Sequence, residues 1–140
     1  MNEARAGRTV GEIMTRDPIV IRADAPLSEV ARLLDRHHIS GLPVVDGSGA
    51  LVGVVSHTDL LRARATEHLW ANWPGLAVRH LMTSPALSVG AGTTIGEAAR
   101  LMERERVHRL VIVGEDGRTP IGIISTADLV RTMAEEARHA

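Results

Sequence analysis

The sequence predicts an α/β fold (of the α+β type) in which two copies of a βαββα unit pack through their sheets. Three observations support this prediction. The stretch "GVVSHTDLLR" at 53–62 returns as "GIISTADLVR" at 122–131, and the similarity extends over most of each half of the chain. Each half also contains one segment with apolar residues at helical spacing and several short β-rich runs. A unit of this size buries too little apolar surface alone, so two units would cover each other's sheets.

Each copy has a recognisable beginning and end. A Met-Thr…Pro pattern opens the copies, starting at Met14 in the first and at Met82 in the second. A Gly-h-h-Ser-x-x-Asp pattern, in which h is apolar, closes the strand-rich part of both copies. We therefore assign a first unit to residues 8–69, a linker to 70–77 and a second unit to 78–135.

The first copy starts with a β-rich run at 19–22, followed by an amphipathic helix at 26–38. The apolar residues of this helix recur at i, i+3, i+4 and i+7, namely Leu27, Val30, Ala31 and Leu34. This spacing puts them on one helix face, and Pro26 suits the first turn. The runs "LPVV" and "LVGVV" then flank Asp46-Gly47-Ser48-Gly49, a combination typical of a hairpin turn. A second helix is expected from Thr58.

The second copy repeats this order. Its first helix carries the same apolar stripe, made of Ile95, Ala98, Ala99 and Met102. The runs "LVIV" and "IGII" flank "GEDGRTP" and predict a second hairpin. The glycine-rich stretch 47–53 joins two strands rather than a strand and a helix, so it favours a hairpin over a dinucleotide-binding loop.

Composition excludes several function classes. The chain has 140 residues and a formal net charge of −1, which gives no electrostatic case for nucleic-acid binding. It has no cysteine, so disulfides and thiolate metal sites are excluded. No apolar run approaches the roughly 20 residues that span a bilayer, so we expect no membrane segment and a cytoplasmic location. His37 and His38 are adjacent and face different sides of a helix, so we expect no metal site.

The repeated Ser-x-x-Asp motif has two interpretations. Ser56-x-x-Asp59 and Ser125-x-x-Asp128 both stand where a strand passes into a helix, and there they resemble a capping box that satisfies the free amides of the first turn. The same position is also suited to a nucleotide, because a hydroxyl and free amides at a helix N-terminus attract phosphate. The carboxylate one turn later suits two vicinal ribose hydroxyls. With no Phe or Tyr in the chain, a base would rest on aliphatic side chains and backbone.

Together, these motifs resemble the CBS domain (cystathionine-β-synthase domain) family, over about residues 8–135. A tandem pair in this family is called a Bateman module. The resemblance implies two βαββα units related by a pseudo-twofold axis, with two clefts between their sheets. It also implies adenosine-containing ligands in those clefts: AMP, ADP, ATP or S-adenosylmethionine, with no cofactor required.

The resemblance assigns roles to residues of this chain. Asp59 and Asp128 would bind ribose, and Ser56 and Ser125 would lie near phosphate. The cleft and base contacts would come from Val20, Ser40, Gly41, Leu42, Pro43, Thr58, Leu87, Val107, Val111 and Ala127.

One detail of the second copy distinguishes it from the first. "VHRLVIV" at 107–113 looks like the segment of the γ subunit of AMP-activated protein kinase whose His-Arg pair contacts nucleotide phosphates. His108 and Arg109 would therefore bind phosphate, with a solvated pair at a strand start as the alternative. The first copy has the small Ser40-Gly41 at these positions. The second copy also has Val111 and Gly114 where the first has Pro43 and Asp46, so its cleft edge departs from the family pattern.

These observations favour a regulatory ligand sensor over an enzyme. Ligand binding would alter a surface presented to an unidentified protein partner, and the resemblance implies a homodimer, a disc of four CBS units. The helices at 58–69 and 127–138 and the segment Trp70–Trp73 are the expected subunit contacts. The alternative is a structural interaction scaffold in which the Ser/Asp pairs act only as caps. An enzyme acting on nucleotides is the third hypothesis, but no set of catalytic residues supports it.

Overall fold

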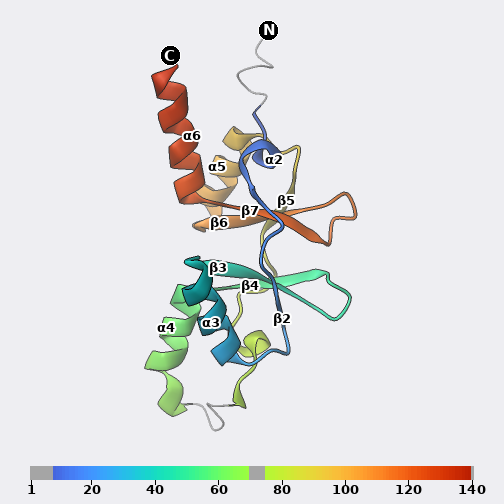
Figure 1. The fold of residues 1–140 in the computed structure, drawn as a ribbon, viewed down its shortest axis with the longest axis vertical. Coiled ribbons are helices and arrows are strands. Elements are labelled where there is room, and N and C mark those ends of the chain that lie inside the picture. Colours follow the sequence, from blue (N-terminus) through green and yellow to red (C-terminus); the bar gives the residue numbers. More distant parts are fainter. Residues whose placement is uncertain (1–7, 70–74, 140) are drawn as a thin grey trace. The chain divides into compact units, whose positions relative to one another are not determined.

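The computed structural model describes residues 8–69 and 75–139, and its contacts divide the chain into two compact units. One unit is Ile19–Ala86, called here the first-repeat unit. The other combines Met1–Pro18 with Leu87–Ala140 and is called the second-repeat unit. Both contain the predicted order of strand, helix, strand, strand and helix, which confirms the mixed α/β fold (Figure 1).

The first-repeat unit is built around a three-stranded sheet with the order β2-β3-β4. Its elements are β2 (Ile21–Arg22), α3 (Leu27–His37), β3 (Gly41–Val45), β4 (Leu51–Ser56) and α4 (His57–Ala65). β3 pairs parallel with β2 and antiparallel with β4. In the described residues after α4, the chain forms the 3₁₀ turns η1 (Glu67–Leu69) and η3 (Val78–His80). The expected helix at 58–69 thus ends earlier, at the position where the Thr66 hydroxyl donates to the carbonyl of Arg62 (2.7 Å).

The second-repeat unit contains a four-stranded sheet with the order β1-β7-β6-β5. Its elements are α2 (Val10–Ile13), β1 (Thr15–Arg16), β5 (Ser88–Gly90), α5 (Ile95–Glu105), β6 (Arg109–Val113), β7 (Pro120–Ser125) and α6 (Thr126–Arg138). β6 pairs parallel with β5 and antiparallel with β7, the same arrangement as in the first-repeat unit.

Both hairpins turn where the sequence predicts. Gly49 (φ 87°) and Gly117 (φ 69°) adopt the left-handed conformation that favours glycine. In each turn an aspartate, Asp46 or Asp116, accepts backbone N–H bonds from the residues that follow it. These bonds satisfy backbone donors that have no partner in a strand ladder.

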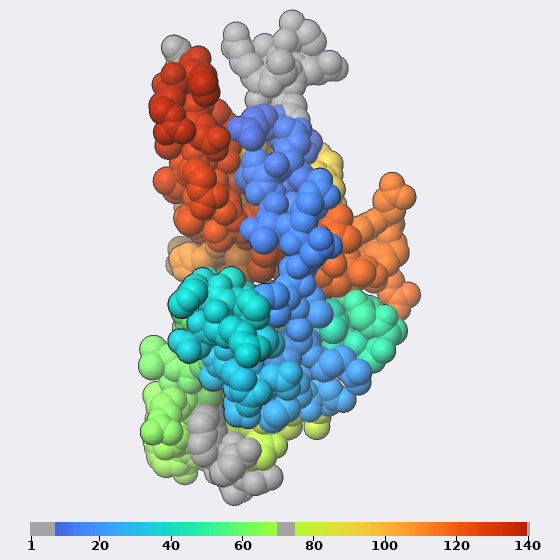
Figure 2. Space-filling view, viewed as in Figure 1, coloured from blue at the N-terminus to red at the C-terminus, as the bar shows by residue number. Residues whose placement is uncertain are grey.

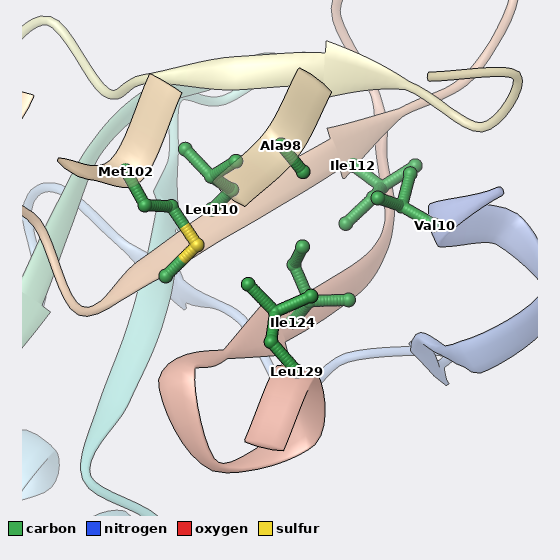
Figure 3. Packing of buried hydrophobic residues seen from close by; sticks show 7 residues of the cluster. All are labelled: Val10, Ala98, Met102, Leu110, Ile112, Ile124 and Leu129. Atoms are coloured by element: carbon green, nitrogen blue, oxygen red, sulfur yellow. The ribbon is translucent and has the colours of Figure 1, made fainter. Parts of the chain in front are cut away.

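The helices of each unit cover one face of its sheet. Figure 3 shows the core of the second-repeat unit, where helix residues meet strand residues: Val10, Ala98, Met102, Leu110, Ile112, Ile124 and Leu129. The core of the first-repeat unit is made of Ile21, Val30, Leu34, Leu42, Val44, Val55 and Val78. Val30 and Leu34 of the predicted stripe in α3, and Ala98 and Met102 of the stripe in α5, therefore face the cores. Ala31 and Ala99, predicted on the same faces, are exposed.

Two segments pack in the unit formed by the other repeat. Residues 8–18, the first leading segment, add β1 to β7, and the N–H of Val10 donates to the carbonyl of Thr93 (2.8 Å). Figure 2 shows this segment in blue against the orange surface of the second repeat. Residues 76–86, the second leading segment, place Val78 in the first-repeat core and bridge Thr83 to Val54. The second-repeat unit is thus completed by residues far away in the sequence, whereas the first-repeat unit is the continuous stretch Ile19–Ala86.

Candidate ligand-binding site

The Ser-x-x-Asp motifs form capping boxes at the N-termini of α4 and α6. Asp59 Oδ2 accepts from the backbone N–H of Ser56 (2.8 Å) and from its hydroxyl (3.1 Å), and the Asp59 N–H donates to Ser56 Oγ (3.4 Å). Asp128 and Ser125 make the same three contacts at 2.7, 3.1 and 3.3 Å. The capping interpretation of both motifs therefore describes real hydrogen bonds.

The second oxygen of each aspartate faces an arginine one turn further along the helix. Arg62 Nη1 lies 3.2 Å from Asp59 Oδ1, and Arg131 Nη1 lies 3.1 Å from Asp128 Oδ1. The aspartate side chains are only 6% and 15% exposed, whereas the arginines are 61% and 66% exposed. A carboxylate has about four acceptor positions. With three of them used by these donors, Oδ1 is the atom that a ligand hydroxyl can still reach.

The strand register brings the predicted phosphate residues of the second repeat next to its capping box. Arg109 pairs with Ser125 across β6 and β7. The backbone N–H of Thr126 donates to the carbonyl of His108 (2.9 Å). His108, Arg109, Ser125 and Asp128 therefore belong to one unit and to one end of its sheet.

The first-repeat unit has the same geometry with smaller side chains. Gly41 pairs with Ser56, and the N–H of His57 donates to the carbonyl of Ser40 (3.0 Å). Ser40 and Gly41 thus occupy the places that His108 and Arg109 occupy in the other unit, as the sequence alignment of the repeats predicts. The two units present different chemistry at equivalent positions.

A hollow of about 610 Å³ lies between the C-terminal end of α5 and the N-terminal end of α6. Its lining includes the predicted residues Val107 and His108, together with Thr126 and the charged Glu103 and Arg106. Sequence reasoning missed the last three. Arg106 ends α5 in the left-handed conformation (φ 55°), which an arginine rarely adopts. Its place two residues before His108 was the available signal, because it adds a second cationic side chain to the same loop.

The family follows from comparison with known proteins. A family model of the CBS domain matches residues 10–66 and again residues 78–135. The chain belongs to the CBS domain family. CBSX2 from Arabidopsis thaliana is similar in structure: its complex with AMP has a TM-score of 0.82 and 35% sequence identity, covering 94% of this chain and 99% of that one.

Two further proteins are similar to this chain over most of its length. The CBS domain of a bacterial CNNM/CorC family Mg²⁺ transporter, solved with ATP, has a TM-score of 0.77 and 26% identity, covering 92% of this chain and 93% of that one. The inosine-5'-monophosphate dehydrogenase of Bifidobacterium longum is 33% identical over 120 residues, or 85% of this chain. The chain spans only 21% of that enzyme's length.

The remaining residues predicted for the CBS clefts fall into three environments. Leu42 is part of the first-repeat core, and Leu87 packs against the second-repeat core. Pro43 and Val111 are buried on the middle strands β3 and β6. The other positions lie at or near the ends of strands and helices, where Val20, Thr58 and Ala127 are exposed, Val107 is half-buried, Ser40 is exposed and Gly41 is buried.

Two further properties concern metals and membranes. Among residues 8–69 and 75–139, no three His, Cys, Asp or Glu side chains are grouped so that they could hold a metal ion. Within the same ranges, no helix has both the length and the apolar character needed to cross a bilayer.

Proposed function

We propose that this CBS pair is a regulatory module that binds an adenosine-containing ligand, AMP, ADP, ATP or S-adenosylmethionine, and signals its presence to a partner protein. The observation that carries the proposal is the likeness to CBSX2, which was solved with AMP and matches this chain over nearly the whole of both lengths. The ATP complex of the transporter CBS domain supports the same ligand class.

In the second-repeat unit, the proposed roles divide between two ends of the ligand. Asp128 Oδ1 would accept from a ribose hydroxyl, because its other oxygen is held by Ser125. His108 and Arg109 would supply donors to phosphate, and Arg106 adds a further guanidinium beside His108. Ser125 would lie near phosphate as well. This unit should therefore bind the more highly phosphorylated ligands.

In the first-repeat unit, Asp59 and Ser56 would have the same roles, but Ser40 and Gly41 offer no cationic side chain. We infer that this unit favours a ligand with little or no phosphate, such as adenosine or S-adenosylmethionine. The buried Pro43 and the exposed Thr58 and Val20 would line its base-binding region.

A structural scaffold is the second candidate, and the capping geometry favours it. Both aspartates have enough partners to be explained as caps alone. The chain offers a matched control, because Thr94 and Glu97 form a third capping box at the start of α5, outside the proposed sites. A cap and a ligand residue can therefore be told apart in one protein.

Calorimetric titration with AMP, ATP, S-adenosylmethionine and 2',3'-dideoxy-AMP would test the proposal. Asp128→Asn should weaken AMP binding about 10- to 100-fold, the cost of a charge-assisted hydrogen bond. It should leave binding of the dideoxy analogue unchanged, because that ligand has no ribose hydroxyl to donate. Glu97→Gln should leave all affinities unchanged. No heat with any ligand, or an equal loss in both variants, would favour the scaffold.

The proposal includes a homodimer, supported by exposed apolar residues on the second helix of both repeats. Leu61 in α4 is 70% exposed, and Val130 and Met133 in α6 are 57% and 64% exposed. Leu69, just after α4, is 73% exposed. Trp70 and Trp73, also expected at this contact, lie outside the described residues. Sedimentation equilibrium of the wild type beside a Val130→Glu/Met133→Glu variant would show whether α6 forms the contact.

A further inference from the structure

Each unit holds one methionine directly against a glycine of its sheet. A Cβ at Gly53 in β4 would lie 2.8 Å from the sulfur of Met82 and 3.1 Å from its Cγ. A Cβ at Gly122 in β7 would overlap the sulfur of Met14 and lie 2.8 Å from its Cγ. In both units the thioether therefore rests on a Cα that carries no side chain. Because the same contact occurs in both units, it is not explained by the chance position of one flexible side chain.

These methionines hold the two leading segments on their sheets. Directly after Met14, β1 pairs with β7. Directly after Met82, Thr83 bridges Val54 through two backbone hydrogen bonds of 2.8 and 3.0 Å. Both side chains also pack against the core of their unit. Each leading segment passes to the other unit a few residues later, at Pro18 and at Ala86.

The sulfur atoms of Met14 and Met82 can also be oxidised. Because the chain has no cysteine, an oxidant that attacks sulfur can react only with methionine. Both methionines are half-buried, so part of each residue is open to solvent and to a small oxidant such as hydrogen peroxide. In the reaction the sulfur gains one oxygen atom and the peroxide is reduced to water. The product, methionine sulfoxide, is bulkier and carries a strong hydrogen-bond acceptor. The glycine and the apolar core residues beside each sulfur have no polar side chain to donate to that oxygen.

We propose that Met14 and Met82 are oxidation sites, and that their conversion to sulfoxide by peroxide releases the leading segments from the sheets. The energetic reason is that a polar acceptor would be placed in an apolar contact without a partner. Methionine sulfoxide reductases reverse the change, so the modification is a reversible one.

The other two methionines of the described chain serve as internal controls. Met133 is 64% exposed on α6, at the proposed subunit contact and outside both cores, so its oxidation should leave both leading segments in place. Met102 is 5% exposed in the second-repeat core and should react last. Met14 and Met82 should react before Met102, while the protein is still folded.

The test is a peroxide titration of the full chain, with peptide mass mapping, hydrogen exchange and thermal melting at each step. Oxidation of Met14 and Met82 should raise amide exchange in residues 14–17 and 82–84, and should lower Tm by roughly 3–6 °C per site. A Met14→Leu/Met82→Leu variant should resist both changes, since leucine has a similar volume and cannot be oxidised. Met133→Leu should not protect.

Three outcomes would overturn the proposal. The first is full oxidation of Met14 and Met82 with unchanged exchange and Tm. The second is their oxidation only together with Met102, which would mean that they react in the unfolded chain. The third is a loss of Tm on peroxide treatment of the Met14→Leu/Met82→Leu variant that equals the loss in the wild type. None of these measurements uses a nucleotide, so the result is independent of the proposed function.

Discussion

At the scale of single residues, the aspartates of the two capping boxes do two kinds of structural work. One oxygen caps the helix and the other pairs with an exposed arginine. We expect Asp59→Ala and Asp128→Ala to cost about 1–2 kcal/mol, with the more buried Asp59 the costlier. Arg62→Ala and Arg131→Ala should each cost less than about 1 kcal/mol, because exposed ion pairs contribute little. Urea unfolding of the four variants would measure this, and equal losses would contradict it.

Asp116, in the hairpin between β6 and β7, makes the stability of the fold depend on pH. Hydrogen bonds from the Thr119 hydroxyl, and from the backbone N–H groups of Thr119 and Arg118, lower the pKa of its carboxyl from 3.8 to about 2. A folded pKa below the unfolded one means that the ionised aspartate stabilises the fold above about pH 4. That contribution is lost as the pH falls toward 2.

Asp116→Asn should therefore flatten the decrease of Tm between about pH 4 and pH 2, because asparagine does not titrate. Melting curves of both proteins over that range would measure the change. Asp24→Asn is the matched control, since Asp24 is also exposed but its carboxylate pairs with the side chain of Arg22. If the slope of Tm against pH changed equally in both variants, the effect would come from the change in net charge instead.

At the scale of elements, local patterns in the sequence were sufficient for most of the fold. Helical spacing located α3 and α5, and the Asp/Gly turns located both hairpins, because these features depend on residues close together in the chain. The pairing of β1 with β7 had no such signal, since the paired residues lie at opposite ends of the sequence. The same limit applies to the site. The motifs identified the capping boxes and His108, and Arg106 lies close to His108 in the chain. Glu103 and Thr126 line the same hollow because the end of α5 lies beside the start of α6.

The glycines opposite the leading segments should differ in their tolerance of a side chain. At Gly122 the three atoms nearest to an added Cβ all belong to the flexible side chain of Met14, which can move. At Gly53 it also meets the backbone oxygen of Thr83 at 2.8 Å, which is held in a bridge. We expect Gly122→Ala to cost about 1–3 kcal/mol and Gly53→Ala to cost more. Gly92→Ala is the control, because a Cβ there meets nothing within 4 Å. Denaturant unfolding would rank the three, and the reverse order would contradict the argument.

At the scale of the whole molecule, each repeat depends on a segment that precedes the other one. Val10 lies in the core with residues from 98 to 129, and Val78 lies in the core with residues from 21 to 55. The two units therefore exchange leading segments along the chain. The second-repeat unit is thereby built from two stretches of chain that lie on either side of the first-repeat unit in the sequence.

Because of this exchange of segments, we expect a substitution in a leading segment to change amide exchange in elements that are far from it in the sequence. Val10→Ala should leave a cavity in the second-repeat core and cost about 1–3 kcal/mol, because Val10 is fully buried. Its effect should appear as faster amide exchange in α5, β6 and β7, nearly a hundred residues away in the chain. Val78→Ala, equally buried, should raise exchange in α3, β3 and β4 instead. Hydrogen exchange read by mass spectrometry separates the two patterns. If Val10→Ala raised amide exchange in α3 and β3 but not in α5 and β6, residues 8–18 would pack in the repeat that they precede. The proposed exchange of leading segments would then be wrong.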